Sequence, residues 1–164
     1  MENTIKNTSD DKHKIVEKYF DMIYKLALSQ AKDSYVAEDV TADVFLKYIE
    51  SSKAFKSEEH IKAWLIRVTI NRVKCVFTSS WNKKTGPLLE TIGAQMIEEE
   101  SEVYQAVLTL PQKYRLVVHL FYYEGLKTAE IAKYLKIKEA TVRSQLLRAR
   151  QLLKITLEGE NEYV

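Results

Sequence analysis

The chain has 164 residues, of which 46% are hydrophobic and 29% charged, and its net charge is +2. This length holds one domain or two small ones with an adequate core, and a net charge so close to zero means that nucleic-acid binding would have to depend on local basic patches. One cysteine excludes an internal disulfide, and four glycines and two prolines leave little turn chemistry for a β fold. We therefore expect an all-α protein. The polar N-terminus and the short apolar runs indicate neither a secretion signal nor membrane insertion.

Two long amphipathic helices are predicted near the N-terminus, from His13 to about Ala31 and from about Tyr35 to Ser51. The second helix buries a valine-rich stripe, and Asp39 and Asp43, four residues apart, share its outer face with Glu38. Paired carboxylates can serve acid–base or metal chemistry, but no glycine-rich or histidine-bearing segment accompanies them. A solvated face, or an acidic docking patch for a basic partner, is favoured over catalysis.

A polar connector follows at residues 51–59, with Phe55 between Lys53 and Lys56. An aromatic ring among basic residues suits stacking on an unpaired base, but burial of the ring in the core explains the pattern equally well. A third helix is predicted from about Glu59 to Ser79. Its exposed positions are Arg67, Asn71, Arg72 and Lys74. An asparagine between cations can read bases, or it can be an ordinary solvated residue.

The chain changes character from residue 80 to about 102, where two glycines, a proline and an acidic run indicate a linker between two domains. This linker also contains apolar residues, so a purely solvated tether is not expected. Residues 103–110 are predicted to form a short helix. Pro111 fits the first turn of the next helix, predicted over 112–124, and Gly125 fits the position just after its end.

Residues 127–153 contain two amphipathic patterns separated by a tight turn. We expect Thr128 to cap the first helix, and Val142, Leu146, Ala149 and Leu153 to form the buried stripe of the second. This pattern is typical of a helix-turn-helix. The outer face of the second helix carries Arg143, Ser144, Leu147, Arg148, Arg150 and Gln151. Leu147 could contact a thymine methyl group. A plain hairpin with a solvated basic face is the alternative, but such helices more often mix charges.

With both halves considered, the chain resembles a bacterial RNA polymerase sigma factor of the extracytoplasmic-function (ECF) group. Residues 110–153 are similar to the family's Leu-Pro, Glu-Gly-Leu, Glu-Ile-Ala and Thr-Val-Arg-Ser…Arg-Ala-Arg signature. Residues 37–49, AEDVTADVFLKYI, and residues 63–72, AWLIRVTINR, support the resemblance in the first half.

The resemblance implies a region 2-like domain at 11–80, a linker at 81–102 and a region 4-like domain at 103–157. The residues implied to bind core polymerase are Glu38, Asp39, Ala42 and Asp43. Those implied for the minus-10 element are Phe55, Lys56, Arg67, Asn71 and Arg72. Those implied for the minus-35 element are Arg143, Ser144, Leu147, Arg148 and Arg150.

The implied partners are core RNA polymerase, promoter DNA and an anti-sigma protein, and the implied state is a cytoplasmic monomer without enzymatic activity, cofactor or metal. Two departures from the family pattern stand out. Lys136 occupies a turn position where the family often has glycine, which costs on the order of 1 kcal/mol if the backbone is left-handed there. Ala42 stands where the docking motif often has glutamine.

Two other classes of protein fit the sequence less well. A stand-alone helix-turn-helix regulator would need a dimer and a palindromic site. An enzyme is disfavoured because His13, His60 and His119 lie in separate segments without metal-ligand spacing, and no nucleophile motif is present.

Overall fold

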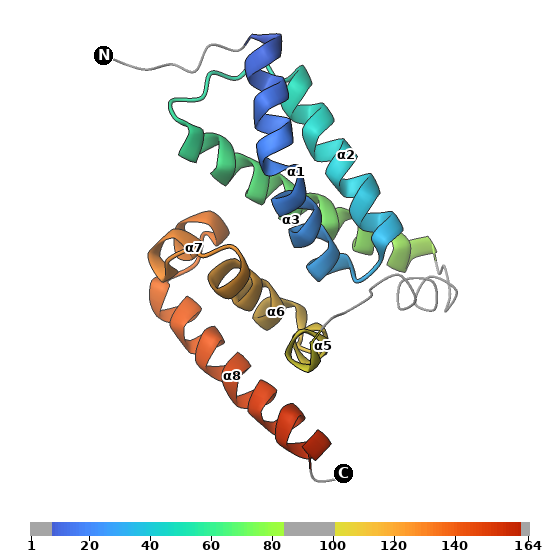
Figure 1. Ribbon diagram of the computed structural model, residues 1–164, viewed down its shortest axis with the longest axis vertical. Coiled ribbons are helices and arrows are strands. Elements are labelled where there is room, and N and C mark those ends of the chain that lie inside the picture. Colours follow the sequence, from blue (N-terminus) through green and yellow to red (C-terminus); the bar gives the residue numbers. More distant parts are fainter. Residues whose placement is uncertain (1–7, 84–100, 162–164) are drawn as a thin grey trace. The chain divides into compact units, whose positions relative to one another are not determined.

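The computed structural model describes residues 8–83 and 101–161, which form two units on either side of residues 84–100 (Figure 1). The first unit contains α1 (Ser9–Ala31), α2 (Ser34–Glu50) and α3 (Glu58–Lys83). The second contains α5 (Glu102–Leu108), α6 (Gln112–Val118), the π-helical segment η1 (His119–Tyr123), α7 (Thr128–Leu135) and α8 (Glu139–Asn161). The described ranges contain no strand, and the all-α prediction is confirmed. Most of the predicted linker lies outside the described residues.

In the first unit, a tight connection makes α1 and α2 neighbours along their length (Figure 1). Helix α1 ends because Lys32 adopts the left-handed conformation, with a φ of 57°, and its N–H donates to the carbonyl of Leu28. Asp33 then caps α2, since its carboxylate accepts from the backbone N–H groups of Tyr35 and Val36 at 2.9 and 3.3 Å. The two helices are therefore set as a hairpin by local chemistry.

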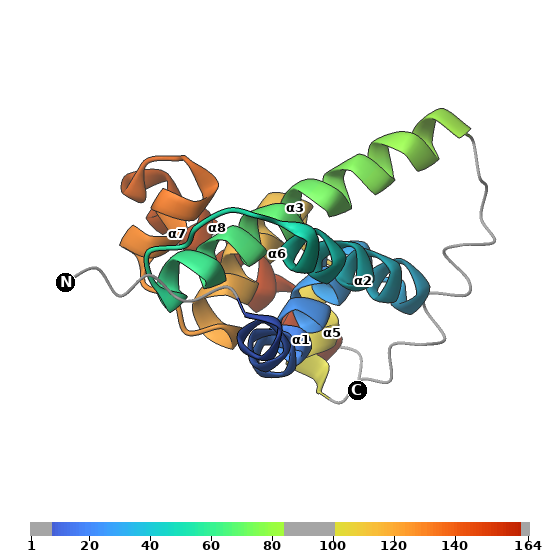
Figure 2. The same ribbon diagram turned by 90° about the horizontal axis from the view of Figure 1, so that it is seen from above.

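Helix α3 packs against both α1 and α2, and its C-terminal end projects beyond them (Figure 2). The core between the three helices is mainly apolar, with no exposed surface on Ile23, Leu26, Val40, Val44, Leu65 and Ile66. Thr41 and Thr69 are equally buried, and their hydroxyls donate to the carbonyls of Ala37 and Leu65 within their own helices. Lys12 of α1 donates to the carbonyls of Ile49 and Ser51 at 2.6 and 3.1 Å, which places a cation at the C-terminal end of α2.

The start of α3 is fixed to α1 by Glu58. The hydroxyl of Tyr19 donates to Glu58 Oε1 at 2.9 Å, and the ammonium of Lys18 pairs with the same oxygen. The hydrogen bonds from Lys18 and Tyr19 lower the pKa of Glu58 below its ordinary value. Burial, together with the bond to Glu58, raises the pKa of Tyr19, so this phenol stays protonated as a donor.

In the second unit, α8 packs against α5, α6 and α7 (Figure 1). The buried stripe predicted for this helix is confirmed at Val142, Leu146 and Ala149, whose exposed fractions are 0, 2 and 0%, whereas Leu153 is only half-buried. Val117 of α6 and Leu120 of η1 also have no exposed surface. The long helix is thus held along its inner face, and its outer face is left to solvent.

The helix predicted over 112–124 runs without a break from Gln112 to Tyr123, but its last turn, η1, is wider than an α-helical turn. The N–H of Glu124 donates to the carbonyl of His119, five residues earlier, at 3.0 Å. In an α-helix, residues five apart do not share a face, whereas the wider turn brings His119 Nε2 within 3.0 Å of Glu124 Oε1. Pro111 precedes α6 as its N-cap residue instead of lying within the first turn. Gly125, with a φ of 69°, ends the segment as predicted.

Candidate nucleic-acid and partner interfaces

The turn between α7 and α8 is built on a left-handed residue. Lys136 has a φ of 57° and a ψ of 44°, so the strained conformation anticipated from the sequence is present. The N–H groups of Lys136 and Ile137 both donate to the carbonyl of Ala132, which closes the end of α7. Helix α8 then starts at Glu139, and the two helices form the predicted helix-turn-helix.

Thr128 has a different role from the one predicted. Lys127 is the residue that precedes α7, and its N–H donates to Glu130 Oε1 at 3.2 Å. The Thr128 hydroxyl instead donates to Glu139 Oε1 at 2.9 Å, and the same oxygen accepts from Arg143 Nη1 at 3.1 Å. A side chain expected to cap one helix therefore links the starts of two.

The outer face of α8 presents the five side chains predicted to read a minus-35 element. Arg143, Ser144, Leu147, Arg148 and Arg150 are all exposed. Leu147 keeps 55% of its surface in solvent although it is apolar. The Ser144 hydroxyl donates to the carbonyl of Ala140 at 3.2 Å, and Arg148 Nη1 donates to Gln151 Oε1 at 3.3 Å. These contacts are within α8 and leave the face open.

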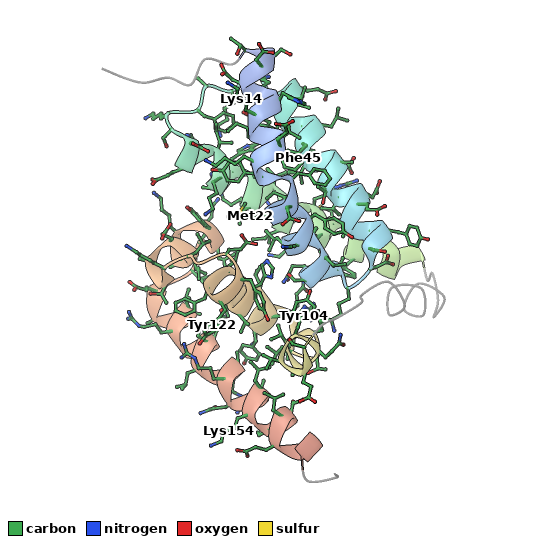
Figure 3. All side chains as sticks on the ribbon, viewed as in Figure 1. Lys14, Met22, Phe45, Tyr104, Tyr122 and Lys154 are labelled. Atoms are coloured by element: carbon green, nitrogen blue, oxygen red, sulfur yellow. The ribbon has the colours of Figure 1, made fainter. Side chains whose placement is uncertain are left out.

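Arg150 differs from the other four because it is bound to its own unit. Its Nε donates to the hydroxyl of Tyr122 at 2.7 Å, and its guanidinium lies 5.7 Å from the centre of the Tyr122 ring. Tyr122 belongs to η1 and is seen beside α8 in Figure 3. In this arrangement Arg150 holds α8 against η1, and it is less free to contact a base than the sequence suggested.

Of the two interpretations of Phe55, the structure agrees with burial. Phe55 is 3% exposed, and its ring centre lies 5.9 Å from that of Tyr48, 5.8 Å from that of Trp64 and 5.3 Å from that of His60. The ring anchors the connector to the first unit. Lys53 and Lys56 remain exposed beside it.

The other residues predicted for the minus-10 element lie on α3. Asn71 is exposed, whereas Arg67 and Arg72 are half-buried. Arg72 binds Asp43 of α2 through two nitrogens, with Nη2 at 2.7 Å and Nε at 2.9 Å from Asp43 Oδ2. The structure thus pairs Arg72, which was predicted to contact the minus-10 element, with Asp43, which was predicted to contact core polymerase.

The prediction that Asp43 faces solvent on its helix is correct only in part. Only 34% of the Asp43 side chain is exposed, because α3 brings Arg72 against this part of α2. Glu38, Asp39 and Ala42 are exposed, as the sequence suggested.

Sequence reasoning missed an apolar stripe on the exposed face of α2. Tyr35, Leu46 and Ile49 keep 57, 52 and 49% of their surface in solvent. With Ala42 they follow steps of seven, four and three residues, so they lie on one side of the helix and suit packing against another helix. The signal was present in the sequence as apolar residues out of phase with the buried stripe.

Other kinds of site are not found in the described part of the chain. Within residues 8–83 and 101–161, no group of three or more histidine, cysteine or carboxylate side chains could hold a metal ion. Nor is any helix in these ranges both long enough and apolar enough to span a membrane.

Both halves of the chain match models of one protein family. Residues 15–82 match Sigma-70 region 2, and residues 100–153 match Sigma-70, region 4. The chain is 28% identical over 143 residues to RNA polymerase sigma factor SigV of Bacillus subtilis (strain 168), covering 84% of this chain and 86% of SigV. It is 26% identical over 166 residues to ECF RNA polymerase sigma factor SigW of the same organism, covering 85% of each.

Solved structures agree on the fold. CnrH, solved in complex with the cytosolic domain of CnrY, matches with a TM-score of 0.71 at 19% identity, covering 93% of this chain and 90% of CnrH. The sigma factor RpoE of Bartonella quintana, solved with the anti-sigma factor NepR, matches with a TM-score of 0.62 at 20% identity, covering 92% of this chain and 98% of RpoE. The region matches, the relatives and the shared fold lead to one conclusion: the chain belongs to the ECF group of the sigma-70 family of RNA polymerase sigma factors.

Proposed function

We propose that this sigma factor binds core polymerase with the exposed face of α2, reads a minus-10 element with the connector and α3, and reads a minus-35 element with α8. The chain directs promoter-specific initiation and is not an enzyme, since sigma factors are regulatory subunits of the polymerase. The observation that carries the assignment of α8 is its open outer face, which follows directly on a helix-turn-helix turn and presents arginines around an exposed Leu147.

For the minus-35 element, we assign base contacts to Arg143, Ser144, Leu147 and Arg148. An arginine can bind the O6 and N7 atoms of guanine with two hydrogen bonds, and a leucine can pack on a thymine methyl group. Each good bidentate contact contributes about 1–3 kcal/mol of discrimination. Arg150 has a supporting role in this proposal, because its guanidinium is engaged by Tyr122.

For the minus-10 element, we assign base reading to Asn71, whose exposed amide can form two hydrogen bonds with adenine. Lys56, Arg67 and Arg72 supply phosphate contacts and therefore salt dependence. Phe55 contributes indirectly, because its buried ring anchors the connector that carries Lys56. Insertion of the ring into DNA would require it to leave the cluster with Tyr48 and Trp64.

For core polymerase, the proposed surface combines the carboxylates of Glu38 and Asp39 with the apolar stripe of Tyr35, Ala42, Leu46 and Ile49. Exposed apolar residues in a row are costly for a free protein, and a partner helix with a basic flank would cover them. We give Asp43 a different role, because from α2 it orients Arg72 of α3.

The RpoE relative was solved with an anti-sigma factor, and we extend this kind of partner to the present chain. In our proposal the anti-sigma protein covers the polymerase-binding face, the free sigma factor is a cytoplasmic monomer, and the two functional domains span residues 11–80 and 103–157.

Paired variants test the assignment of faces. Arg148→Ala is expected to weaken initiation that depends on the minus-35 element and to leave core binding unchanged, whereas Asp39→Lys is expected to weaken core binding. Run-off transcription and a pull-down of core polymerase measure the two effects separately. If Arg148→Ala abolished core binding while Asp39→Lys left it intact, the faces would be wrongly assigned.

A further inference from the structure

Glu139, the first residue of α8, has a shared carboxylate oxygen at the start of the outer face. Glu139 Oε1 accepts one hydrogen bond from Thr128 Oγ1 of α7 at 2.9 Å and another from Arg143 Nη1 at 3.1 Å. The Glu139 and Arg143 side chains are 43 and 62% exposed, so this network lies at the surface that would meet DNA.

We propose that Glu139 is a positioning residue for promoter reading: anchored by Thr128, it holds the guanidinium of Arg143 in one place on the outer face of α8. The inference rests on the proposed function of α8. It concerns a residue that is not among the side chains assigned to base contacts.

The Thr128 hydroxyl is what distinguishes this arrangement from an ordinary surface ion pair. A glutamate and an arginine four residues apart on an exposed helix hold each other weakly, because both side chains are long and mobile. Thr128 restrains the carboxylate from a second helix, so the arginine has a fixed partner. Arginine loses much rotamer freedom when it binds, and a restrained arginine loses less.

The same carboxylate has an opposite effect on non-specific binding. A negative charge at the DNA-facing end of α8 repels phosphates, so it lowers affinity for any duplex regardless of sequence. Glu139 therefore lowers the affinity of the protein for duplex DNA in general and raises its discrimination between promoter sequences. Loss of a purely structural residue would weaken both specific and non-specific binding, whereas loss of the Glu139 charge should weaken discrimination and strengthen non-specific binding.

Glu139→Gln tests the proposal directly, since glutamine keeps the shape and an acceptor for Thr128 but lacks the charge that holds Arg143. The assay reconstitutes the sigma factor with bacterial core polymerase and measures initiation on a panel of promoters with single changes in the minus-35 element. Arg143→Ala identifies the base pair that depends on Arg143. At that base pair, Glu139→Gln is expected to reduce discrimination about 3- to 10-fold, within the range of one arginine–guanine contact. Its affinity for an unrelated duplex is expected to rise.

Thr128→Val provides the second variant, because it removes the anchor and leaves every charge in place. It is expected to reduce discrimination at the same base pair without raising non-specific affinity, and to add no further loss in the Arg143→Ala background. Glu158→Gln is the matched control. Glu158 also pairs with a cation four residues away on α8, Lys154 at 4.0 Å, and its variant is expected to leave discrimination unchanged.

The outcomes separate the inference from the function on which it rests. If Arg143→Ala lost discrimination at a base pair where Glu139→Gln and Thr128→Val did not, the positioning role would be wrong and the proposed function of α8 would stand. If Arg143→Ala lost no discrimination at any position, the assignment of Arg143 itself would fail, and the inference with it. If Glu139→Gln and Glu158→Gln lost discrimination equally, the change in net charge would explain the effect and the positioning role would be wrong.

Discussion

Replacing Lys136 with glycine should stabilise the second unit by about 0.5–1 kcal/mol. A left-handed conformation costs a residue with a Cβ roughly 1–2 kcal/mol, and Lys136 lies in that region with a φ of 57°. Glycine removes this cost but adds freedom to the unfolded chain, which offsets about 0.5–1 kcal/mol. The Lys136 side chain is exposed, so little packing is lost with it.

Amide hydrogen exchange is the suitable probe, because both tryptophans, Trp64 and Trp81, lie outside the second unit and their fluorescence would not report on it. The amides of Val142 and Leu146 lie in its core, and a gain of this size should slow their exchange roughly two- to fivefold. Lys136→Ala is the control, since alanine also removes the charge and the long side chain but keeps the strain. If Lys136→Gly exchanged as fast as Lys136→Ala, the cost assigned to the left-handed turn would be wrong.

Three further predictions concern the first unit. Thermal unfolding followed by tryptophan fluorescence checks the stability change in each, and run-off transcription with a pull-down of core polymerase checks the functional effect of Asp43→Asn. Phe55→Ala should cost about 3–5 kcal/mol of stability, because it empties the cluster around Tyr48 and Trp64, whereas a ring reserved for DNA would cost almost nothing. Asp43→Asn should lower stability by less than about 1 kcal/mol and weaken initiation without weakening core binding, since it releases Arg72. Wild-type protein should lose more stability than Glu58→Gln on acidification, since the lowered pKa of Glu58 means that its contribution is present at neutral pH and disappears as pH falls through the folded-state value.

Each of these predictions has an outcome that would contradict it. A fully stable Phe55→Ala variant with defective promoter melting would restore base capture as the role of Phe55. Loss of core binding in Asp43→Asn would return Asp43 to the polymerase surface. Parallel acid profiles for wild type and Glu58→Gln would mean that the bonds from Lys18 and Tyr19 do not favour the carboxylate in solution.

Features set by local sequence were predictable. The buried stripe of α8 follows from helical spacing, and a tight turn before it follows from two apolar patterns so close together. The left-handed conformation of Lys136 itself was suggested only by the resemblance, since the family often has glycine at this position. The exposed arginines of α8 follow from the same spacing, since they lie on the positions that the stripe leaves out.

Features set by contacts between distant elements were not predictable. The pairing of Asp43 with Arg72 depends on where α3 crosses α2, and spacing within one helix carries no information on that crossing. The burial of Phe55 depends on the same packing. The π-helical turn brings His119 Nε2 to 3.0 Å from Glu124 Oε1, a contact that the residue spacing of an α-helix does not predict. The network around Glu139 likewise required the relative placement of α7 and α8.

Run-off transcription tests the central claim most directly. Purified bacterial core polymerase would be supplied with a library of randomised promoters, with and without this protein, and the transcripts sequenced. The account predicts transcripts from promoters sharing two spaced elements, present only when the protein is added and diminished at one element by Arg148→Ala. An identical transcript population with and without the protein, together with no binding to core polymerase, would contradict it.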